Sequence, residues 1–159
     1  MNFNDEAIDD VFSKVVSYAM LTGRFDYVNQ HEPVSSPHQG VQCSVWIQRI
    51  HPIASSGLSS TSGVVQLSAR IYMNFVAEPR DVIDPKITAA ICDLMGTLSA
   101  DFDFGGEAGV RAVDLLGMSG ISLEAQAGYL EIDRQMFRVM TLTIPVIIDD
   151  MFIQRSSRG

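Results

Sequence analysis

The sequence predicts an α+β domain in which two main helices pack against an antiparallel or mixed β-sheet. Three observations predict this class. Apolar residues recur at helical spacing in two segments, polar and apolar residues alternate over residues 64–75, and turn signals separate several further strands. The expected order is helix, three strands, helix, three strands (α-βββ-α-βββ). Residues 1–150 are expected to form this single domain, and residues 151–159 a flexible C-terminal tail.

Each expected helix has a start signal and a stop signal. The first should begin at Asn4, a capping residue followed by acidic side chains that suit the positive end of a helix dipole. Gly23 should end it. The second helix should begin at Asp84-Pro85, with the aspartate as cap and the proline at the first helical position. It should stop before Asp101.

The first half of the sheet is expected to contain a short strand at residues 25–28 and a long antiparallel hairpin. Residues 41–50 and 64–75 form the two arms of this hairpin, because both segments alternate in polarity. Arg70 and Tyr72 lie on the polar phase and should face water or a partner. Trp46 lies on the polar phase of the first arm, where it is either covered by the fold or exposed at an interface.

The last third of the chain is expected to form strands at about residues 109–116, 125–132 and 135–148. A turn at Asp133-Arg134 should join the last two. Pro145 has no N–H to donate to a neighbouring strand, so the end of the last strand should be an edge or a bulge.

Residues 51–63 form a long low-complexity segment between the hairpin arms. One interpretation is a flexible hairpin loop. The other is an arm that orders on a neighbouring molecule, because a long loop in a compact domain often carries function. The candidate contact residues of this arm are Ser55, Ser56, Gly57, Leu58, Ser59, Ser60 and Thr61.

Composition excludes several classes of protein. The chain has 159 residues, 47% hydrophobic content and a formal net charge of −8, which opposes binding to nucleic acid and to anionic membranes. No apolar run reaches the roughly 18 to 20 residues that span a bilayer. The acidic N-terminus is unlike a signal peptide, so folding in a cytoplasm is expected. Cys43 and Cys92 are expected to be small buried apolar residues.

The sequence predicts no catalytic, cofactor or metal site. It lacks the motifs of serine hydrolases, zinc proteases, phosphate-binding loops and dinucleotide-binding folds. The three histidines (His31, His38 and His51) lie in or beside loops without the spacing of metal ligands. The paired carboxylates Asp101/Asp103 and Asp149/Asp150 are interpreted as solvated turn residues.

Several blocks of sequence, taken in order, resemble the tail terminator proteins of bacteriophages with long, flexible, non-contractile tails, in the branch common among phages of actinobacteria. The resemblance covers roughly residues 25–150 and rests on the joint order of the blocks. These are Val28-Asn-Gln-His-Glu-Pro33, Ser55-Ser-Gly-Leu-Ser-Ser-Thr-Ser62, Glu78-Pro79 with Ile83-Asp-Pro85, Val113-Asp-Leu-Leu-Gly117, Ala125-Gln-Ala-Gly-Tyr129, and Phe137-Arg-Val-Met140 running to Ile144-Pro145.

The resemblance implies a structural protein of the virion with the α+β fold of that family. Its subunits form a hexameric ring at the head-proximal end of the tail, which caps the tube and stops polymerisation at the set length. The implied partners are other copies of the chain, the major tail tube protein and a head-tail connector or neck protein. DNA passes through the lumen without specific binding. The resemblance implies no enzymatic activity and no cofactor.

Trp46, Arg70 and Tyr72, together with the arm at 51–63, are the candidate interface residues on this interpretation. Three rival interpretations remain open, and one of them is an enzyme whose site the sequence does not reveal. The chain resembles in size, charge and strand content another neck, connector or tail tube protein. It also fits a small α+β domain outside any virion that binds a ligand beside its sheet.

Overall fold

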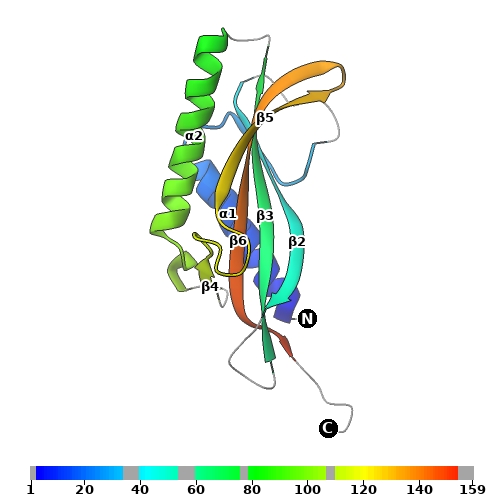
Figure 1. Ribbon diagram of the computed structural model, residues 1–159, viewed down its shortest axis with the longest axis vertical. Helices are drawn as coiled ribbons and strands as arrows, with labels where there is room; N and C mark the ends of the chain where they lie inside the picture. Colours follow the sequence, from blue (N-terminus) through cyan, green and yellow to red (C-terminus); the bar gives the residue numbers. More distant parts are fainter. Residues whose placement is uncertain (1–2, 34–39, 54–59, 76–78, 107–109, 154–159) are drawn as a thin grey trace.

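The chain folds into one six-stranded sheet with two helices against it (Figure 1). The computed structural model describes residues 3–33, 40–53, 60–75, 79–106 and 110–153. This confirms the α+β class and the order α-βββ-α-βββ. The elements are α1 (Phe3–Leu21), β1 (Tyr27–Asn29), β2 (Gln42–Ile53), β3 (Ser60–Asn74), α2 (Arg80–Ala100), the 3-10 helix η1 (Phe104–Gly106), β4 (Val110–Val113), β5 (Glu124–Ile132) and β6 (Gln135–Ile153).

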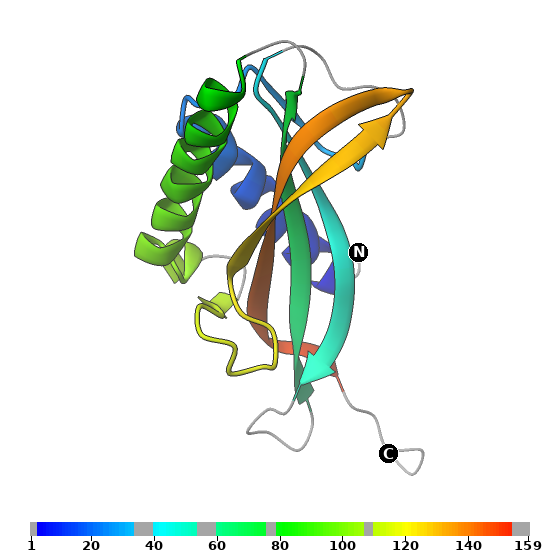
Figure 2. The same cartoon turned by 45° about the horizontal axis from the view of Figure 1, so that its top comes forward.

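The sheet is mixed, with strand order β1-β2-β3-β6-β4 and β5 also paired to β6. Among the described strands, β1 and β2 run parallel and the other pairs are antiparallel. The predicted hairpin of β2 and β3 is present. In Figure 2, β5 and the start of β6 leave the plane of the other strands and sweep across the sheet. The sheet is therefore strongly curled.

The core lies between the helices and one face of β2, β3 and β6. On β3 the predicted alternation is confirmed for this face, because its apolar positions from Val65 to Met73 are buried. They meet apolar residues of both helices. The buried contributors include Val11, Val15 and Ala19 of α1, Ile87, Leu94 and Leu98 of α2, and Leu142, Ile144 and Val146 of β6.

The first helix matches its prediction closely, but the second begins earlier than predicted. Near the end of α1, Gly23 adopts a positive φ of 68°, as a helix-ending glycine does. α2 begins at Arg80 rather than Asp84, so Pro85 lies inside the helix. The reason is tertiary: the Val82 N–H bonds to the Pro79 carbonyl at 3.0 Å, and Ile83 is buried in the core. Burial of Ile83 stabilises an additional turn before the Asp-Pro signal.

The prediction was that the end of this strand, at Pro145, is an edge or a bulge: the edge is wrong, whereas the strand is irregular a few residues later, at Asp149 and Asp150. β6 is an internal strand with β3 on one side and β4 and β5 on the other. The Pro145 carbonyl accepts a bond from Asp114 N at 2.8 Å, and the N and C=O of one strand residue point to the same side. The missing N–H therefore faces the junction where β5, paired up to Thr143, gives way to β4, paired from Val146.

The long strands match the sequence prediction at one end and extend beyond it at the other. The turn at Asp133-Arg134 is confirmed, and both residues have positive φ, as tight hairpin turns require. At the other end, β2 and β3 run through 51–53 and 60–63, because His51 pairs with Val64. The expected loop at 51–63 is thus mostly strand, and residues 54–59 lie outside the described part of the chain.

β6 also continues beyond its predicted end. It passes an irregularity at the exposed residues Asp149 and Asp150 and reaches Ile153, so residues 151–153 belong to the sheet rather than to a tail. Met151 is buried, which anchors this extension in the core. Residues 154–159, the rest of the expected tail, lie outside the described residues.

One cysteine was predicted correctly and the other was not. Cys43 is buried on the helix-covered face of β2, and burial raises the pKa of its thiol to about 12. Cys92 is exposed, because it lies on the side of α2 that faces away from the sheet, next to the exposed Asp93.

We expect Arg138 to hold the β5–β6 hairpin against α2. Arg138 bonds to Asp84 at 2.9 Å and to the Gly128 carbonyl at 3.2 Å, and its guanidinium lies 4.5 Å from the centre of the Tyr129 ring. Its side chain is 18% exposed. Arg138→Ala should lower the free energy of unfolding by about 1–3 kcal/mol, measured by denaturant titration.

Arg24 provides the matched control for this substitution. It makes one ion pair, with Asp93 at 2.6 Å, and its side chain is 50% exposed. Arg24→Ala should therefore cost only about 0–1 kcal/mol. Equal losses for the two variants would show that Arg138 does not tie the hairpin to the helix.

Candidate functional site

The face of the sheet opposite the helices, called here the outer face, carries a polar cluster centred on Arg70. Its guanidinium lies 5.2 Å from the centre of the Trp46 ring, and its Nε donates to Thr141 Oγ1 at 2.8 Å. Glu32 lies 4.0 Å from it. Trp46 and Arg70 are brought together because Trp46 pairs with Ser68 across the β2–β3 ladder, which makes Arg70 its diagonal neighbour. Both side chains remain partly exposed.

Tyr72 does not belong to the exposed part of this face, which corrects the expectation that it meets water or a partner. It is buried against Phe137, with the ring centres 6.4 Å apart in an edge-to-face arrangement. Leu130 and Ile132 of β5 pack against this pair, because the hairpin curls over the outer face. Burial raises the pKa of the Tyr72 phenol, although the positive charge of Arg70 opposes the rise.

The predicted arm contributes little to the described surface. Ser55, Ser56, Gly57, Leu58 and Ser59 lie outside the residues that the structure describes. The two remaining candidates belong to β3: Ser60 opens the strand, and Thr61 is half-buried and pairs with Phe152 of β6. The arm therefore stays a prediction.

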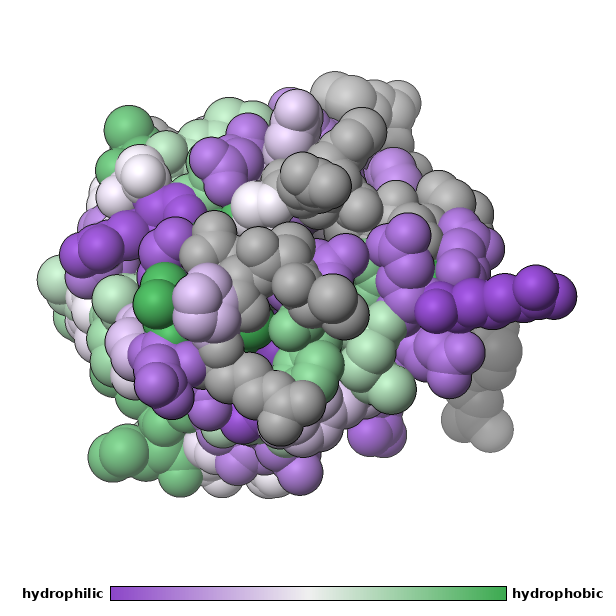
Figure 3. Space-filling model, turned by 90° about the horizontal axis from the view of Figure 1, so that it is seen from above, coloured by the Kyte–Doolittle hydropathy of each residue, from purple (hydrophilic) through white to green (hydrophobic). Residues whose placement is uncertain are grey.

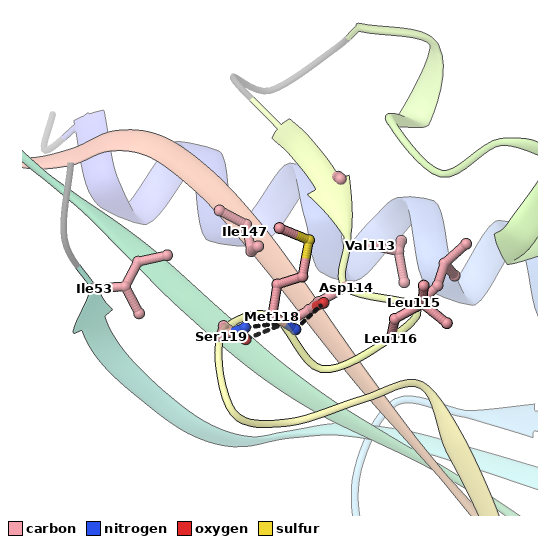
Figure 4. A pocket seen from close by; sticks show the side chains of 9 residues that line it. Ile53, Val113, Asp114, Leu115, Leu116, Met118, Ser119 and Ile147 are labelled. Atoms are coloured by element: carbon pink, nitrogen blue, oxygen red, sulfur yellow. Dashed lines mark hydrogen bonds between the residues drawn. The ribbon is translucent and has the colours of Figure 1, made fainter. Parts of the chain in front are cut away.

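An apolar pocket of about 480 Å³ lies on the outer face, near the end of β2 (Figure 4). The end of β4 and the loop after it form one wall, and Ile53 of β2 and Ile147 of β6 line the rest. Leu116 and Met118 of this loop are 90% and 92% exposed, which is unusual for large apolar side chains. The sequence analysis did not identify this pocket, because its lining comes from three segments far apart in the chain.

Asp114 holds the pocket loop in shape. Its buried carboxylate accepts hydrogen bonds from the backbone N–H groups of Gly117, Met118 and Ser119 at 2.7 to 3.0 Å, and from the Ser119 hydroxyl. Burial raises the pKa of this carboxyl, but the hydrogen bonds favour the charged form more strongly and leave the pKa below its ordinary value of 3.8. Gly117 and Gly120, both at positive φ, were the only local signals of this turn.

In the part of the chain that the structure describes, which includes His31 and His51 but not His38, the carboxylate pairs and histidines form no chemical centre. Asp101, which follows directly after α2, accepts a hydrogen bond from Tyr18, so it ties the end of α2 to α1 rather than standing in solvent as predicted. Asp103 bonds to Gly105 N at 3.1 Å. Among the described residues, no group of three or more His, Cys, Asp or Glu side chains could hold a metal ion. Within the same residues, no helix is long and apolar enough to cross a membrane.

Among the described strands, the two longest open edges belong to β2 and β5, and the short terminal strands β1 and β4 also pair with one strand only. β1 pairs only with Gln42, Cys43 and Ser44 of β2, so residues 46–53 have no strand on their outer edge in the described part of the chain. β5 pairs only with β6, and its other edge is likewise open among the described strands. Figure 3, which looks down on the end where the β5–β6 turn lies, shows hydrophilic side chains interspersed with hydrophobic ones. Open edges of this kind are places where another chain can add a strand.

The Asp114 turn predicts a specific loss of stability in acid. A folded-state pKa below the ordinary value means that this carboxylate stabilises the fold fully above about pH 3.8, and that the contribution disappears as the pH falls through the lower, folded value. We expect Asp114→Asn to be less stable than the parent at neutral pH and to lack this acid-dependent component. Chemical unfolding measured from pH 7 to about pH 2 tests it.

Ser119→Ala is the graded control, because it removes one of the four hydrogen bonds and keeps the carboxylate. Its effect should have the same direction and a smaller size, about 0.5–1.5 kcal/mol. Identical pH profiles for Asp114→Asn and the parent would contradict the role assigned to Asp114.

No protein-family model and no curated protein matches the chain. Among solved structures, the chain is similar to one from an extracellular contractile injection system, described as the PVC sheath/tube terminator in its extended state, with 12% sequence identity and a TM-score of 0.36. The match covers 92% of this chain but 58% of the other, so this chain spans less than two thirds of that protein. A similarity of this size carries no conclusion about function.

Proposed function

We propose that this chain is a structural protein of a bacteriophage virion that caps the tail tube as a ring. In this proposal six identical subunits stop tube polymerisation at the set length and offer a surface for head attachment. The partners are the major tail tube protein and a head-tail connector or neck protein. The protein is assembled in the host cytoplasm and resides at the head-proximal end of a non-contractile tail. It performs no catalysis and needs no cofactor.

The observation that carries this proposal is the pair of open strand edges on β2 and β5. These two edges border the same sheet at opposite ends of its strand order. A contact between them joins two different surfaces of neighbouring copies, so it is head-to-tail rather than self-complementary. Head-to-tail contacts between identical subunits close into rings when the rotation fits. The assignment of this ring to a virion is supported by the sequence blocks over roughly residues 25–150 that resemble tail terminators.

The net charge supports a ring through which DNA passes. Six copies would carry a formal charge of about −48. A lumen with acidic groups repels the phosphate backbone, so DNA can move through it without being held. This argument concerns passage alone and names no residue of the lumen.

Trp46 and Arg70 are the proposed interface residues of the outer face. Aromatic and arginine side chains are enriched in protein interfaces, and here they are stacked and partly exposed. The stacking fixes the orientation of both side chains before a partner arrives, which lowers the entropic cost of binding.

A second candidate function rests on the pocket beside Asp114. Its volume and apolar lining suit a small apolar ligand, and the loop that walls it is firmly held. A ligand-binding domain would remain a monomer and would be stabilised by small apolar molecules. Filling the pocket with Ala112→Trp should abolish that stabilisation, whereas capping of a tail should not depend on it.

Deletion of the gene from its phage gives the first test of the proposed function. Without a cap, tube polymerisation has no stop, so electron microscopy of infected cells should show tubes far longer than normal and without heads. Tails of normal length beside unattached heads would instead assign the protein to the neck. Complete virions would exclude both roles.

Substitution of Trp46 and Arg70 tests the proposed interface. Trp46→Ala and Arg70→Ala should leave a folded chain, because both side chains are partly exposed, and should fail to restore normal tails in the deleted phage. Gln66→Ala, at a half-buried outer-face position beside Pro145, is the control and should restore them. If both interface variants cap tails normally while folding normally, these residues do not lie in the interface.

A further inference from the structure

We propose that the open edge of β2, residues 46–53, pairs with the open edge of β5, residues 124–132, in a second copy of the chain. The resulting antiparallel ladder extends the sheet from one subunit to the next. The strand pairing is argued from the described residues alone. Its occurrence in a closed ring rests on the proposed function.

Within the described part of the chain, no other strand covers either edge, and the two edges are of similar length. Residues 47–50 of β2 are all exposed, so neither helix covers this part of the strand. β5 has nine residues, most of them exposed or half-buried along their length. Natural proteins commonly protect long open edges with prolines, inward charges or a covering element. β5 carries no proline, and the only proline of β2 is Pro52, near its end.

The charges of the two edges are complementary. β2 contains Arg49 and no acidic residue, whereas β5 contains Glu124 and Glu131 and no basic residue. All three charged side chains are exposed. Pairing of β5 with β5 would bring four carboxylates together, and pairing of β2 with β2 would bring two arginines together. Like charges across a ladder are destabilising, so charge selects β2 with β5 over either self-pairing.

The strand directions allow this ladder to continue the existing sheet. Along the path β2-β3-β6-β5 every strand is antiparallel to the next, so β5 runs opposite to β2 within one subunit. In a ring whose axis is tilted relative to the strands, as in a closed barrel, these directions stay nearly antiparallel and the offset edges can meet, so β5 of one copy pairs with β2 of the next in antiparallel orientation. This is the more stable of the two strand pairings.

The two open edges are also staggered. Residues 46–53 of β2 lie beside residues 62–68 of β3, whereas β5 lies beside residues 135–143 of β6 and therefore towards the opposite end of the strands. Sheets that close into barrels need such a stagger between successive strands. A head-to-tail contact with stagger leads to a closed ring or a helical filament, and not to a two-fold dimer.

Apolar side chains flank both edges on the same side of the sheet. Ile47 pairs with Leu67 and Ile50 with Val65, which places both isoleucines on the helix-covered side, yet both are partly exposed. Tyr129 of β5 lies on that side too, opposite Arg138, and is also exposed. Covering these side chains would add apolar burial to the backbone bonds of the ladder.

The full-length protein tests the pairing without any phage component. Sedimentation velocity over a wide concentration range should show reversible assembly beyond the dimer. Hydrogen exchange, compared between dilute and concentrated samples, should show that amides in 46–53 and in 124–132 gain protection together. A chain that remains monomeric at every concentration, or that gains protection only elsewhere, would overturn the proposal.

Charge exchange then tests the partners. Arg49→Glu alone, and Glu124→Arg with Glu131→Arg, should each weaken association about tenfold, because each puts like charges across the new ladder. The chain that carries all three substitutions should recover association. Asp9→Arg with Asp10→Arg, on the exposed side of α1, shifts net charge in the same way as the β5 pair and should not weaken association.

The outcomes separate this proposal from the proposed function. Failure of the triple variant to recover, with each variant folded, rejects the β2–β5 pairing even if deletion of the gene yields overlong tails. Normal tails in the deleted phage, with charge exchange behaving as expected, reject the capping role and leave the pairing intact.

Discussion

The antiparallel pairing of β3 with β6 is the interaction on which the rest of the structure depends. These are the two longest strands, with 15 and 19 residues, and their ladder runs almost the whole length of both. One edge of β6 pairs with β3. Its other edge pairs first with β5 and then, further along the strand, with β4. The helices pack on the face that this pair presents, so the core, the curled hairpin and the pocket loop all take their positions from it.

Sharing one edge of β6 between two strands creates the features that bear on function. Pro145 stands where one partner ends and the next begins, and its carbonyl bonds to Asp114 at the start of the pocket loop. β5 pairs only with the first half of β6, residues 135–143. It can therefore curl over the outer face, where it buries Tyr72. The same arrangement leaves the second edge of β5 open. The covered tyrosine, the pocket loop and the open edge thus share one cause.

Local patterns in the sequence were sufficient to predict the helices and strands and to identify the face of the sheet that packs in the core. Alternation from Val65 to Met73 identified the core face because side chains of a strand alternate with period two. The burial of Tyr72 could not be predicted from this alternation, because the residues that cover it lie more than fifty positions later in the chain. Asp114 gave no recognisable signal, because its role comes from three backbone N–H groups. Pro145 does lack an N–H donor, as the sequence analysis argued. However, no local pattern shows that the same edge of β6 pairs with two successive strands.

Self-assembly of so acidic a chain requires a contact that outweighs repulsion between its copies. Subunits of charge −8 repel one another at long range, and this repulsion is screened by salt. Backbone hydrogen bonds of a new ladder are short-range and almost independent of salt, whereas the attraction between Arg49 and the glutamates of β5 selects the partner edge. Moderate salt should therefore favour assembly, because it removes the general repulsion while leaving the ladder intact. A protein that must stay dispersed until a growing tube gathers its copies would benefit from this balance.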